Sequence, residues 1–312
     1  MNSSKWIVCK FGGSSLADAE QIRKSVDIML QNPMRRIMVV SAPGKRSVHD
    51  RKITDQLIEL SQAVEGGYEY TPAIDQMVRR YSEIASELGL KEDYSLRVRD
   101  NLTDRISHKA KLNTRQFTDL IKAAGEDLCA GLVAAYIMSL GIEARYVNPV
   151  DAGLVLEYVK GGRVQVKESS YEKLAELSQA RELIVFPGFF GADESGRVAT
   201  FSRGGSDITG SILAAAVDAR VYENWTDVDS VFSTDPQIIS HPHAIKEMTY
   251  TEMRELAYAG FTILHEEALE PVYYRDIPLF FIGCSILYRI FNSTSQFIRG
   301  IYKSCSQRSF SG

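Results

Sequence analysis

The sequence predicts an α/β protein built around a mainly parallel β-sheet. Residues 5–11 form a short apolar run, followed by a glycine turn and by apolar positions at helical spacing up to residue 30. Residues 35–44 form a second apolar run that ends in another turn. A strand, a helix and a second buried strand in this order make a βαβ unit, and such units occur in parallel sheets.

Apolar segments further along the chain extend the same pattern. Residues 54–140 are mostly helical in pattern and predict a helical excursion from one side of the sheet. The segments that predict further strands are 143–149, 181–192 and 219–230, and those that predict helices between or after them are 171–180, 207–217 and 250–259. A serine ahead of the first helix is expected to be its N-cap.

Length and composition are typical of a globular protein. The 312 residues are 45% hydrophobic and 24% charged, enough for one large domain or two smaller ones. The net charge of −4 argues against nucleic acid as a partner. Four cysteines lie far apart without a C-x-x-C motif, which favours reduced thiols and a cytoplasmic location. No secretory leader or membrane-spanning run is recognised, so we expect no membrane partner.

Small and polar residues gather in the turns that should follow the strands. These turns are 12–15, 41–44, 187–191, 202–207 and 226–230. Ligands of open α/β sheets bind outside the carboxyl ends of the strands, and small residues let backbone N–H groups approach a phosphate. The first turn is not a Walker loop, because its lysine precedes its glycines, and it is not a dinucleotide-binding loop, because it has two glycines and not three spaced ones. We therefore expect a phosphate-rich ligand.

Five motifs occur in an order and at spacings that resemble one enzyme family. They are KFGGSS (10–15), AGE (124–126), GFFG (188–191), RGGSD (203–207) and TDVDSVFSTDP (226–236). Together they resemble the aspartokinases of the amino-acid kinase superfamily, over residues 5–278. The resemblance implies a three-layer α/β/α sandwich. It also implies transfer of the γ-phosphoryl group of MgATP to the side-chain carboxylate of L-aspartate, giving 4-phospho-L-aspartate, the first step toward lysine, threonine and methionine.

That reaction needs positioning and charge neutralisation but no general base. A carboxylate with a pKa of ~3.9 is already a nucleophile at neutral pH, so the site needs cations and N–H donors around the phosphates. Lys10 is the expected catalytic cation, and the N–H groups of Gly12, Gly13 and Ser14 are expected to be further donors. The alternative for Lys10 is a lysine at a strand end whose ammonium group reaches solvent.

The resemblance also implies side chains that hold the amino acid. Arg203 is expected to bind the α-carboxylate, which its guanidinium fork suits, and Glu126 the ammonium group. Asp207 is expected to orient Lys10, although it could instead cap the helix predicted to start near Ile208. The other implied substrate-binding positions are Thr54, Gly204 and Ser206.

Two features near these residues have simpler alternatives. Glu126 follows Ala124 and Gly125 where family members often have histidine and glycine, and a glutamate there could serve only the helix dipole. The loop of residues 44–52, which leads to Thr54, has four basic residues and one acidic residue. It is interpreted either as attracting the two anionic substrates or as an ordinary solvated loop.

The nucleotide is expected to bind at several of the same turns. By resemblance its contacts are Gly12, Gly13, Ser14, Ser41, Gly188, Thr226, Asp227, Phe232, Asp235 and Pro236. Gln237 and Thr262 stand where other members often have arginine and lysine, which puts the affinity for ATP in question. Mg²⁺ is implied by ATP, and because it is held mainly by the phosphates no protein ligand is assigned to it.

The chain changes character after Asp276. Residues 277–312 contain four basic residues and no acidic ones, and neither a last strand nor regulatory ACT domains are recognisable there. We interpret residues 1–278 as the catalytic domain, with aspartate bound by its N-terminal part and ATP by the part from residue 185 on. Residues 279–312 are interpreted as a tail produced by a shifted reading frame or a truncated gene, and the loss of a last strand would expose a sheet edge.

Three functions remain open from the sequence. The leading one is an aspartate kinase, with a homodimer open as its assembly. The second is an inactive or unstable product that at most binds nucleotide. The third is another amino-acid or carbamate kinase of the superfamily, against which Arg203 and Glu126 argue because they suit an α-amino acid.

Overall fold

A computed structural model describes most of the chain. The residues described are 6–159, 164–202, 204–225, 247–258, 266–282 and 287–291. Their strands are β1 (Ile7–Phe11), β2 (Arg35–Val40), β3 (Ala144–Tyr146), β4 (Leu156–Tyr158), β5 (Val164–Val166), β6 (Leu183–Pro187), β7 (Phe190–Ala192), β8 (Val198–Thr200), β9 (Val221–Trp225), β10 (Glu247–Thr249), β11 (Leu279–Ile282) and β12 (Leu287–Phe291).

The helices fall between these strands and confirm the alternating pattern. They are α1 (Ala19–Leu30), α2 (Ile53–Gly66), α3 (Thr71–Glu87), α4 (Tyr94–Ser107), α5 (Thr114–Lys122), α6 (Ala124–Ser139), α7 (Glu168–Ala175), α8 (Gly205–Ala216), α9 (Tyr250–Tyr258) and α10 (Glu266–Tyr274). Short 3₁₀ turns lie at Ser14–Leu16, Lys109–Lys111 and Glu176–Gln179.

Eight of the strands form one sheet, in the order β10-β12-β11-β9-β1-β2-β6-β3. The six strands from β11 to β3 are parallel to their neighbours, and β12 runs antiparallel to β11. The expected mainly parallel sheet is therefore confirmed. The strand β1 is central and all five of its residues are buried, because sheet and helices cover it on both sides.

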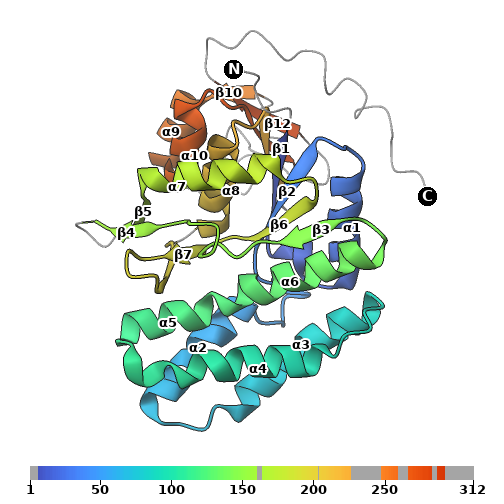
Figure 1. Ribbon diagram of the computed structural model, residues 1–312, viewed down its shortest axis with the longest axis vertical. Coiled ribbons are helices and arrows are strands. Elements are labelled where there is room, and N and C mark those ends of the chain that lie inside the picture. The colour runs from blue at the N-terminus through green and yellow to red at the C-terminus, as the bar shows by residue number, and fades with distance from the viewer. Residues whose placement is uncertain are drawn as a thin grey trace, which may run out of the picture.

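Helices cover both faces of this sheet, which confirms the three-layer sandwich (Figure 1). One core cluster joins α1 and α6 to one face, and a second joins α8 and α10 to the other. The helices α2 to α5 form a further layer beneath α6, at the bottom of the view in Figure 1. This layer is the predicted helical excursion, and its α2 and α3 reach the carboxyl ends of β1 and β2 through the loops described below.

Two local expectations are wrong. The N-cap of α1 is Asp18 and not a serine: its carboxylate accepts a hydrogen bond from the N–H of Gln21 at 2.9 Å, while the preceding serines belong to a 3₁₀ turn. The second error concerns the last strand. Residues Leu279–Ile282 form β11, which pairs in parallel with β9, so β9 is not an exposed edge. The four-residue apolar strand was not recognised in the sequence because the composition after Asp276 is unusual.

Candidate active site

The register of the central strands brings a lysine and an asparagine together. In the β1–β9 pair, Lys10 lies beside Asn224, and both side chains are buried on the face covered by α8. The Lys10 ammonium lies 2.6 Å from the carboxylate of Asp207 in the first turn of α8. The Asp207 carbonyl accepts a hydrogen bond from the hydroxyl of Tyr222 at 3.0 Å, which ties this turn to β9. The result is an oriented ammonium group at the carboxyl end of β1.

The glycine turn after β1 packs against the turn after β2 with almost no space between the two backbones. The N–H of Gly44 donates to the carbonyl of Gly13 at 2.8 Å, and a β carbon on Gly13 would lie 2.9 Å from the carbonyl oxygen of Ala42. The N–H of Gly12 donates to the carbonyl of Trp225 at 3.3 Å, so the expectation that it is a free donor is wrong. Among the described residues, the N–H groups of Gly13 and Ser14 have no such partner and remain available.

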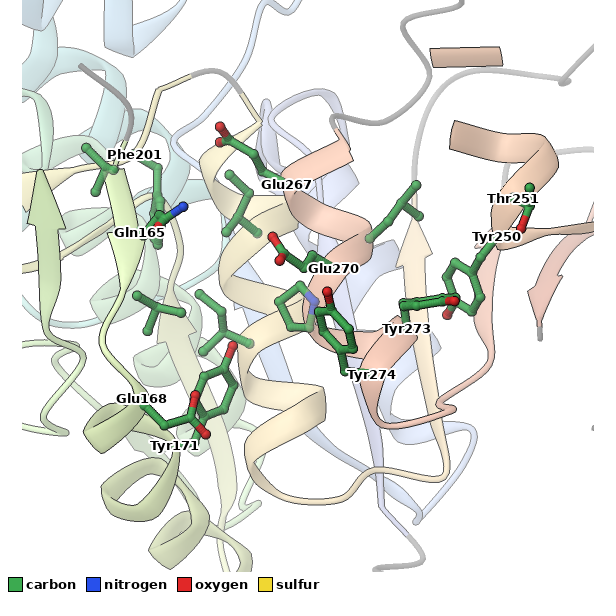
Figure 2. A pocket seen from close by; sticks show the side chains of 16 residues that line it. Gln165, Glu168, Tyr171, Phe201, Tyr250, Thr251, Glu267, Glu270, Tyr273 and Tyr274 are labelled. Carbon is green, nitrogen blue, oxygen red and sulfur yellow. The ribbon is translucent and has the colours of Figure 1, made fainter. Parts of the chain in front are cut away.

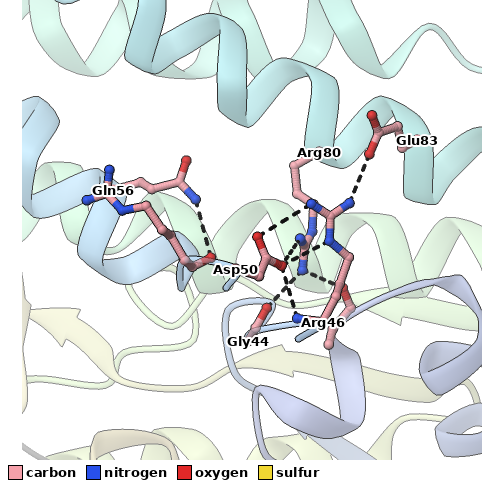
Figure 3. Close-up of polar contacts among 8 residues, drawn as sticks. Gly44, Arg46, Asp50, Gln56, Arg80 and Glu83 are labelled. Carbon is pink, nitrogen blue, oxygen red and sulfur yellow. Dashed lines mark hydrogen bonds and ion pairs between the residues drawn. The ribbon is translucent and has the colours of Figure 1, made fainter. Parts of the chain in front are cut away.

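An arginine from the helical layer fastens these two turns (Figure 3). The guanidinium of Arg80 on α3 is buried and donates to the carbonyls of Ala17 at 2.7 Å and Gly44 at 2.8 Å. It also lies 2.5 Å from the carboxylate of Asp50, which in turn pairs with Arg46 at 2.9 Å. The turn at Gly44 is therefore held by Arg80 as well as by Gly13.

The same ion pairs bear on whether the basic loop of residues 44–52 attracts anionic substrates. Arg46 is paired with Asp50 and Glu83, and Arg51 is paired with Glu59. Two of the four basic side chains thus already have carboxylate partners within the protein. This weakens the interpretation of the loop as an attractor of anionic substrates.

A second tight contact joins the turn after β6 to the start of α8. A β carbon on Gly188 would lie 2.6 Å from the β carbon of Ser206. The helix begins at Gly205, with Gly204 as a left-handed N-cap residue (φ 70°) that makes no side-chain cap. Asp207 is thus the third residue of the helix and not its cap, so the capping alternative is wrong. Its carboxylate is free to bind Lys10.

Glu126 supplies a buried carboxylate at the start of α6. Only 5% of the residue is exposed, and its Oε2 has no hydrogen-bond partner in the described structure. Burial raises the pKa of Glu126 to about 8, against the smaller lowering effects of a hydrogen bond from the Ala42 backbone and the charge of Lys122. The Ala42 turn also packs against Gly13, so this carboxylate and the glycine turn flank one short segment.

Comparison with known proteins decides the family. A model of the amino acid kinase family matches residues 5–283, most of the chain. The chain belongs to that family. Aspartokinase 3 of Bacillus subtilis is 46% identical over 272 residues, which are 87% of this chain and 60% of that protein. Lysine-sensitive aspartokinase 3 of Escherichia coli is 29% identical over 288 residues, 90% of this chain and 62% of that protein.

Solved structures agree with the fold of this amino acid kinase. The aspartate kinase of Clostridium acetobutylicum has a TM-score of 0.80 at 36% identity, with 94% of this chain and 64% of that chain covered. Aspartokinase III of E. coli, in complex with aspartate and ADP, has a TM-score of 0.79 at 27% identity, with 93% and 65% covered. The chain thus spans less than two thirds of the length of these relatives.

Some of the predicted site lies outside the described residues. This applies to Arg203, to the nucleotide-binding positions Thr226, Asp227, Phe232, Asp235 and Pro236, and to Gln237 and Thr262. Thr54 lies in the first turn of α2, directly after Ile53, whose N–H donates to the carbonyl of Pro43 at 3.3 Å. Ser41 directly follows β2, and its N–H donates to the carbonyl of Phe11 at 3.2 Å. The roles given to these residues stay predictions.

Sequence reasoning missed residues whose importance depends on tertiary contacts. Asn224 touches both Lys10 and Asp207, and its only sequence signal was a polar residue in a buried strand. Phe189 has a left-handed backbone (φ 75°), and its N–H donates to the hydroxyl of Thr209 at 3.0 Å. This conformation turns the chain sharply between β6 and β7, within the GFFG segment of residues 188–191.

A separate cavity of about 500 Å³ lies among β5, α7, α8, α9 and α10, and none of the predicted site residues lines it (Figure 2). Tyrosines and the carboxylates of Glu168, Glu267 and Glu270 surround it. Within the described ranges, no cluster of three metal-ligating side chains occurs. No helix in that same part of the chain is long and apolar enough to cross a membrane.

Proposed function

We propose that this amino acid kinase transfers the γ-phosphoryl group of ATP to the side-chain carboxylate of L-aspartate, giving 4-phospho-L-aspartate. The observation that carries the proposal is the pairing of two opposite binding features across the Ala42 turn. On one side, the ammonium group of Lys10 stands beside the glycine turn. On the other side, the buried carboxylate of Glu126 has an unpartnered oxygen, which suits the ammonium group of an amino acid.

The residues can support the reaction without a base. The attacking carboxylate is already ionised at neutral pH, so the chain must bring two anions together and neutralise charge as the phosphoryl group moves. Lys10 would contact the transferring phosphoryl oxygens, with Asp207 fixing its ammonium group. The N–H groups of Gly13 and Ser14 would donate to the phosphates at the start of a short helical turn. Arg203 would hold the α-carboxylate.

The relatives support the choice of substrates. Several similar proteins carry the name aspartokinase, and the E. coli structure contains aspartate and ADP. Mg²⁺ would accompany ATP, held chiefly by the phosphate oxygens, where it offsets their negative charge. This chain spans 60% of the length of the B. subtilis relative, and the substrates are proposed for that span.

We assign residues 1–278 to the catalytic unit, with Thr54, Gly204 and Ser206 at the aspartate. The nucleotide contacts proposed are Ser41, Gly188, Thr226, Asp227, Phe232, Asp235 and Pro236. The product would enter the synthesis of lysine, threonine and methionine. The widely spaced cysteines support a cytoplasmic location, and a homodimer is the assembly to test.

The test is the trapping of the acyl phosphate. Purified protein, MgATP and aspartate are incubated with hydroxylamine, which converts an acyl phosphate into a coloured hydroxamate. We expect hydroxamate with aspartate and none when ATP is omitted. Product from glutamate in place of aspartate would favour another amino-acid kinase of the family. No product from well-folded protein would overturn the proposal in favour of an inactive product.

A further inference from the structure

We propose that Asn224 is a positioning residue for phosphoryl transfer: it holds Lys10 and Asp207 in a three-residue arrangement that leaves one N–H of the lysine ammonium free for the phosphoryl group. The inference rests on the proposed function, because it assigns a role within the same site. It is drawn from the contacts of a side chain that is 2% exposed and lies between the other two.

The contacts of Asn224 fit only one orientation of its amide. The Nδ2 group donates to Oδ1 of Asp207 at 2.8 Å, and Oδ1 of Asn224 faces the Lys10 ammonium at 3.4 Å. An amide carries a donor and an acceptor a short distance apart, so it can satisfy a carboxylate and an ammonium group together. A carboxylate at this position would repel Asp207, and an apolar side chain would satisfy neither neighbour.

A count of donors shows what this arrangement achieves. The Lys10 ammonium has three N–H donors. One is directed to Asp207 at 2.6 Å and a second to Asn224, and no third acceptor occurs among the described residues. The ammonium nitrogen lies 3.6 Å from the place where a β carbon of Gly12 would stand, so the absence of a side chain keeps that space open. The third donor therefore remains for a ligand at the turn.

The strand that carries Asn224 is fixed from its other face. Glu223 is fully buried and pairs with Arg35 at 2.9 Å, and its carboxylate also accepts the indole N–H of Trp225 at 3.1 Å. The ring of Trp225 stacks on Phe11 of β1 with centroids 5.9 Å apart. The residues before and after Asn224 are thus locked to β1 and β2, which sets the amide in place before any ligand binds.

The experiment compares two substitutions at this position with a matched control. Asn224→Leu keeps the approximate size of the side chain but removes the donor and the acceptor. Asn224→Asp keeps the shape and adds a second carboxylate beside Asp207. The control is Asn148→Leu, which removes hydrogen bonds to Tyr146 and Val150 near the edge strand β3 and touches neither Lys10 nor Asp207. Thermal unfolding shows which variants are folded, and kcat and KM are measured for each.

We expect a loss in kcat of at least tenfold for Asn224→Leu and a larger loss for Asn224→Asp, with the KM for aspartate changed less than threefold in both. The Asn148→Leu variant should keep the wild-type kcat whatever its melting temperature. A kcat within twofold of wild type in either folded Asn224 variant would overturn the inference. So would equal losses in the Asn224→Leu and Asn148→Leu variants, because these would indicate a purely structural role.

A parallel measurement separates this inference from the proposed function. ATP hydrolysis without an amino acid also needs Lys10 but no acceptor carboxylate. If the wild type hydrolyses ATP and forms no aspartyl phosphate, the proposed substrate is wrong. Hydrolysis rates that fall from the wild type to Asn224→Leu, and fall further in Asn224→Asp, would still support the role of Asn224. Equal hydrolysis rates would overturn it, and a wild type without either activity would overturn both proposals.

Discussion

Gly44 and Gly13 pack backbone against backbone: a β carbon on Gly44 would stand 2.6 Å from the carbonyl carbon of Gly13 and 2.9 Å from the nitrogen of Ser14. Real β carbons do not approach backbone atoms this closely. The turn after β2 therefore sets the shape of the glycine turn after β1, although 30 residues of chain lie between the two glycines. The proposed phosphate site is therefore shaped by two turns and not by one motif.

The Gly44→Ala substitution should damage ATP use more than it damages folding. The added methyl group meets only backbone atoms, so the two turns must separate and the free N–H groups of Gly13 and Ser14 must move. Overpacking of this kind costs about 1–3 kcal/mol of unfolding free energy, and a misplacement of about 1 Å can cost on the order of 100-fold in rate. We expect a KM for ATP raised about tenfold and a lower kcat.

The control for that experiment is Gly131→Ala in the middle of α6. There a β carbon would meet the guanidinium end of Arg97, at 2.8 Å, which is a flexible partner that can move. This variant should keep the wild-type kcat and KM. Its free energy of unfolding should be equal to or greater than that of the wild type, because alanine has a higher helix propensity than glycine. A wild-type KM for ATP in folded Gly44→Ala protein would show that the two turns do not form the nucleotide site.

Arg80 is expected to couple the helical layer to the same site. The Arg80→Ala substitution removes the donors to the carbonyls of Ala17 and Gly44 and leaves the carboxylate of Asp50 without one of its partners. We expect a loss of about 3–4 kcal/mol in unfolding free energy, measured by urea denaturation, at the lower side of the range for broken buried ion pairs. The KM for ATP should rise as well, because the Gly44 turn is held by one contact fewer.

Two further variants make the Arg80 result specific. Arg79→Ala removes an exposed neighbour on the same helix and should change neither stability nor KM by a measurable amount. Arg80→Lys keeps the positive charge but has no planar fork, so it should recover only part of the lost stability. Full recovery by lysine would mean that charge alone holds the turn, and not the fork that reaches two carbonyls and a carboxylate at once.

Much of the fold could be predicted because its signals are local. The strand and glycine turn of residues 7–15 are contiguous, and the alternation of apolar segments with helical ones sufficed for a parallel sheet. The Asp18 cap and the strand Leu279–Ile282 were missed for two different reasons. A serine and an aspartate are nearly equivalent as caps, and a four-residue strand is recognised only by the neighbour it pairs with.

The candidate site could be predicted in its residues more than in its contacts. Lys10, Glu126 and Asp207 stand out in sequence motifs, whereas the role of Asn224 depends on the register between β1 and β9, which are 214 residues apart at that pair. The raised pKa of Glu126 likewise follows from burial, which no motif encodes. Arg80 had no signal at all, because its acceptors are two backbone carbonyls and a loop carboxylate.

Replacing Lys10 should abolish turnover and leave the fold. In Lys10→Ala, Asp207 keeps the amide donor of Asn224, so its carboxylate is still partly satisfied and the protein should remain folded. The phosphoryl group loses its positioned cation, for which losses of about 100- to 1000-fold in kcat are typical. The hydroxamate assay measures the loss. Lys24→Ala, which removes a mostly exposed lysine of α1, is the control and should be fully active. Activity within tenfold of wild type in Lys10→Ala would refute the catalytic role.

Glu126 should make both stability and aspartate binding depend on pH. Burial raises its pKa from 4.5 to about 8 in the folded chain. Below pH 4.5 the folded and unfolded chains both carry the proton on Glu126. Between pH 4.5 and pH 8 only the unfolded chain loses it, so the free energy of unfolding falls as pH rises, by up to about 1.4 kcal/mol per pH unit.

Aspartate binding should depend on the same proton. The ammonium group of the substrate needs the ionised Glu126 carboxylate, so aspartate should bind more tightly at pH 8 than at pH 6. Binding should release the proton of Glu126, which calorimetry detects as a heat that depends on the buffer. Glu126→Gln should remove both dependences and weaken aspartate binding. An unchanged pH profile in that variant would place the titrating group elsewhere.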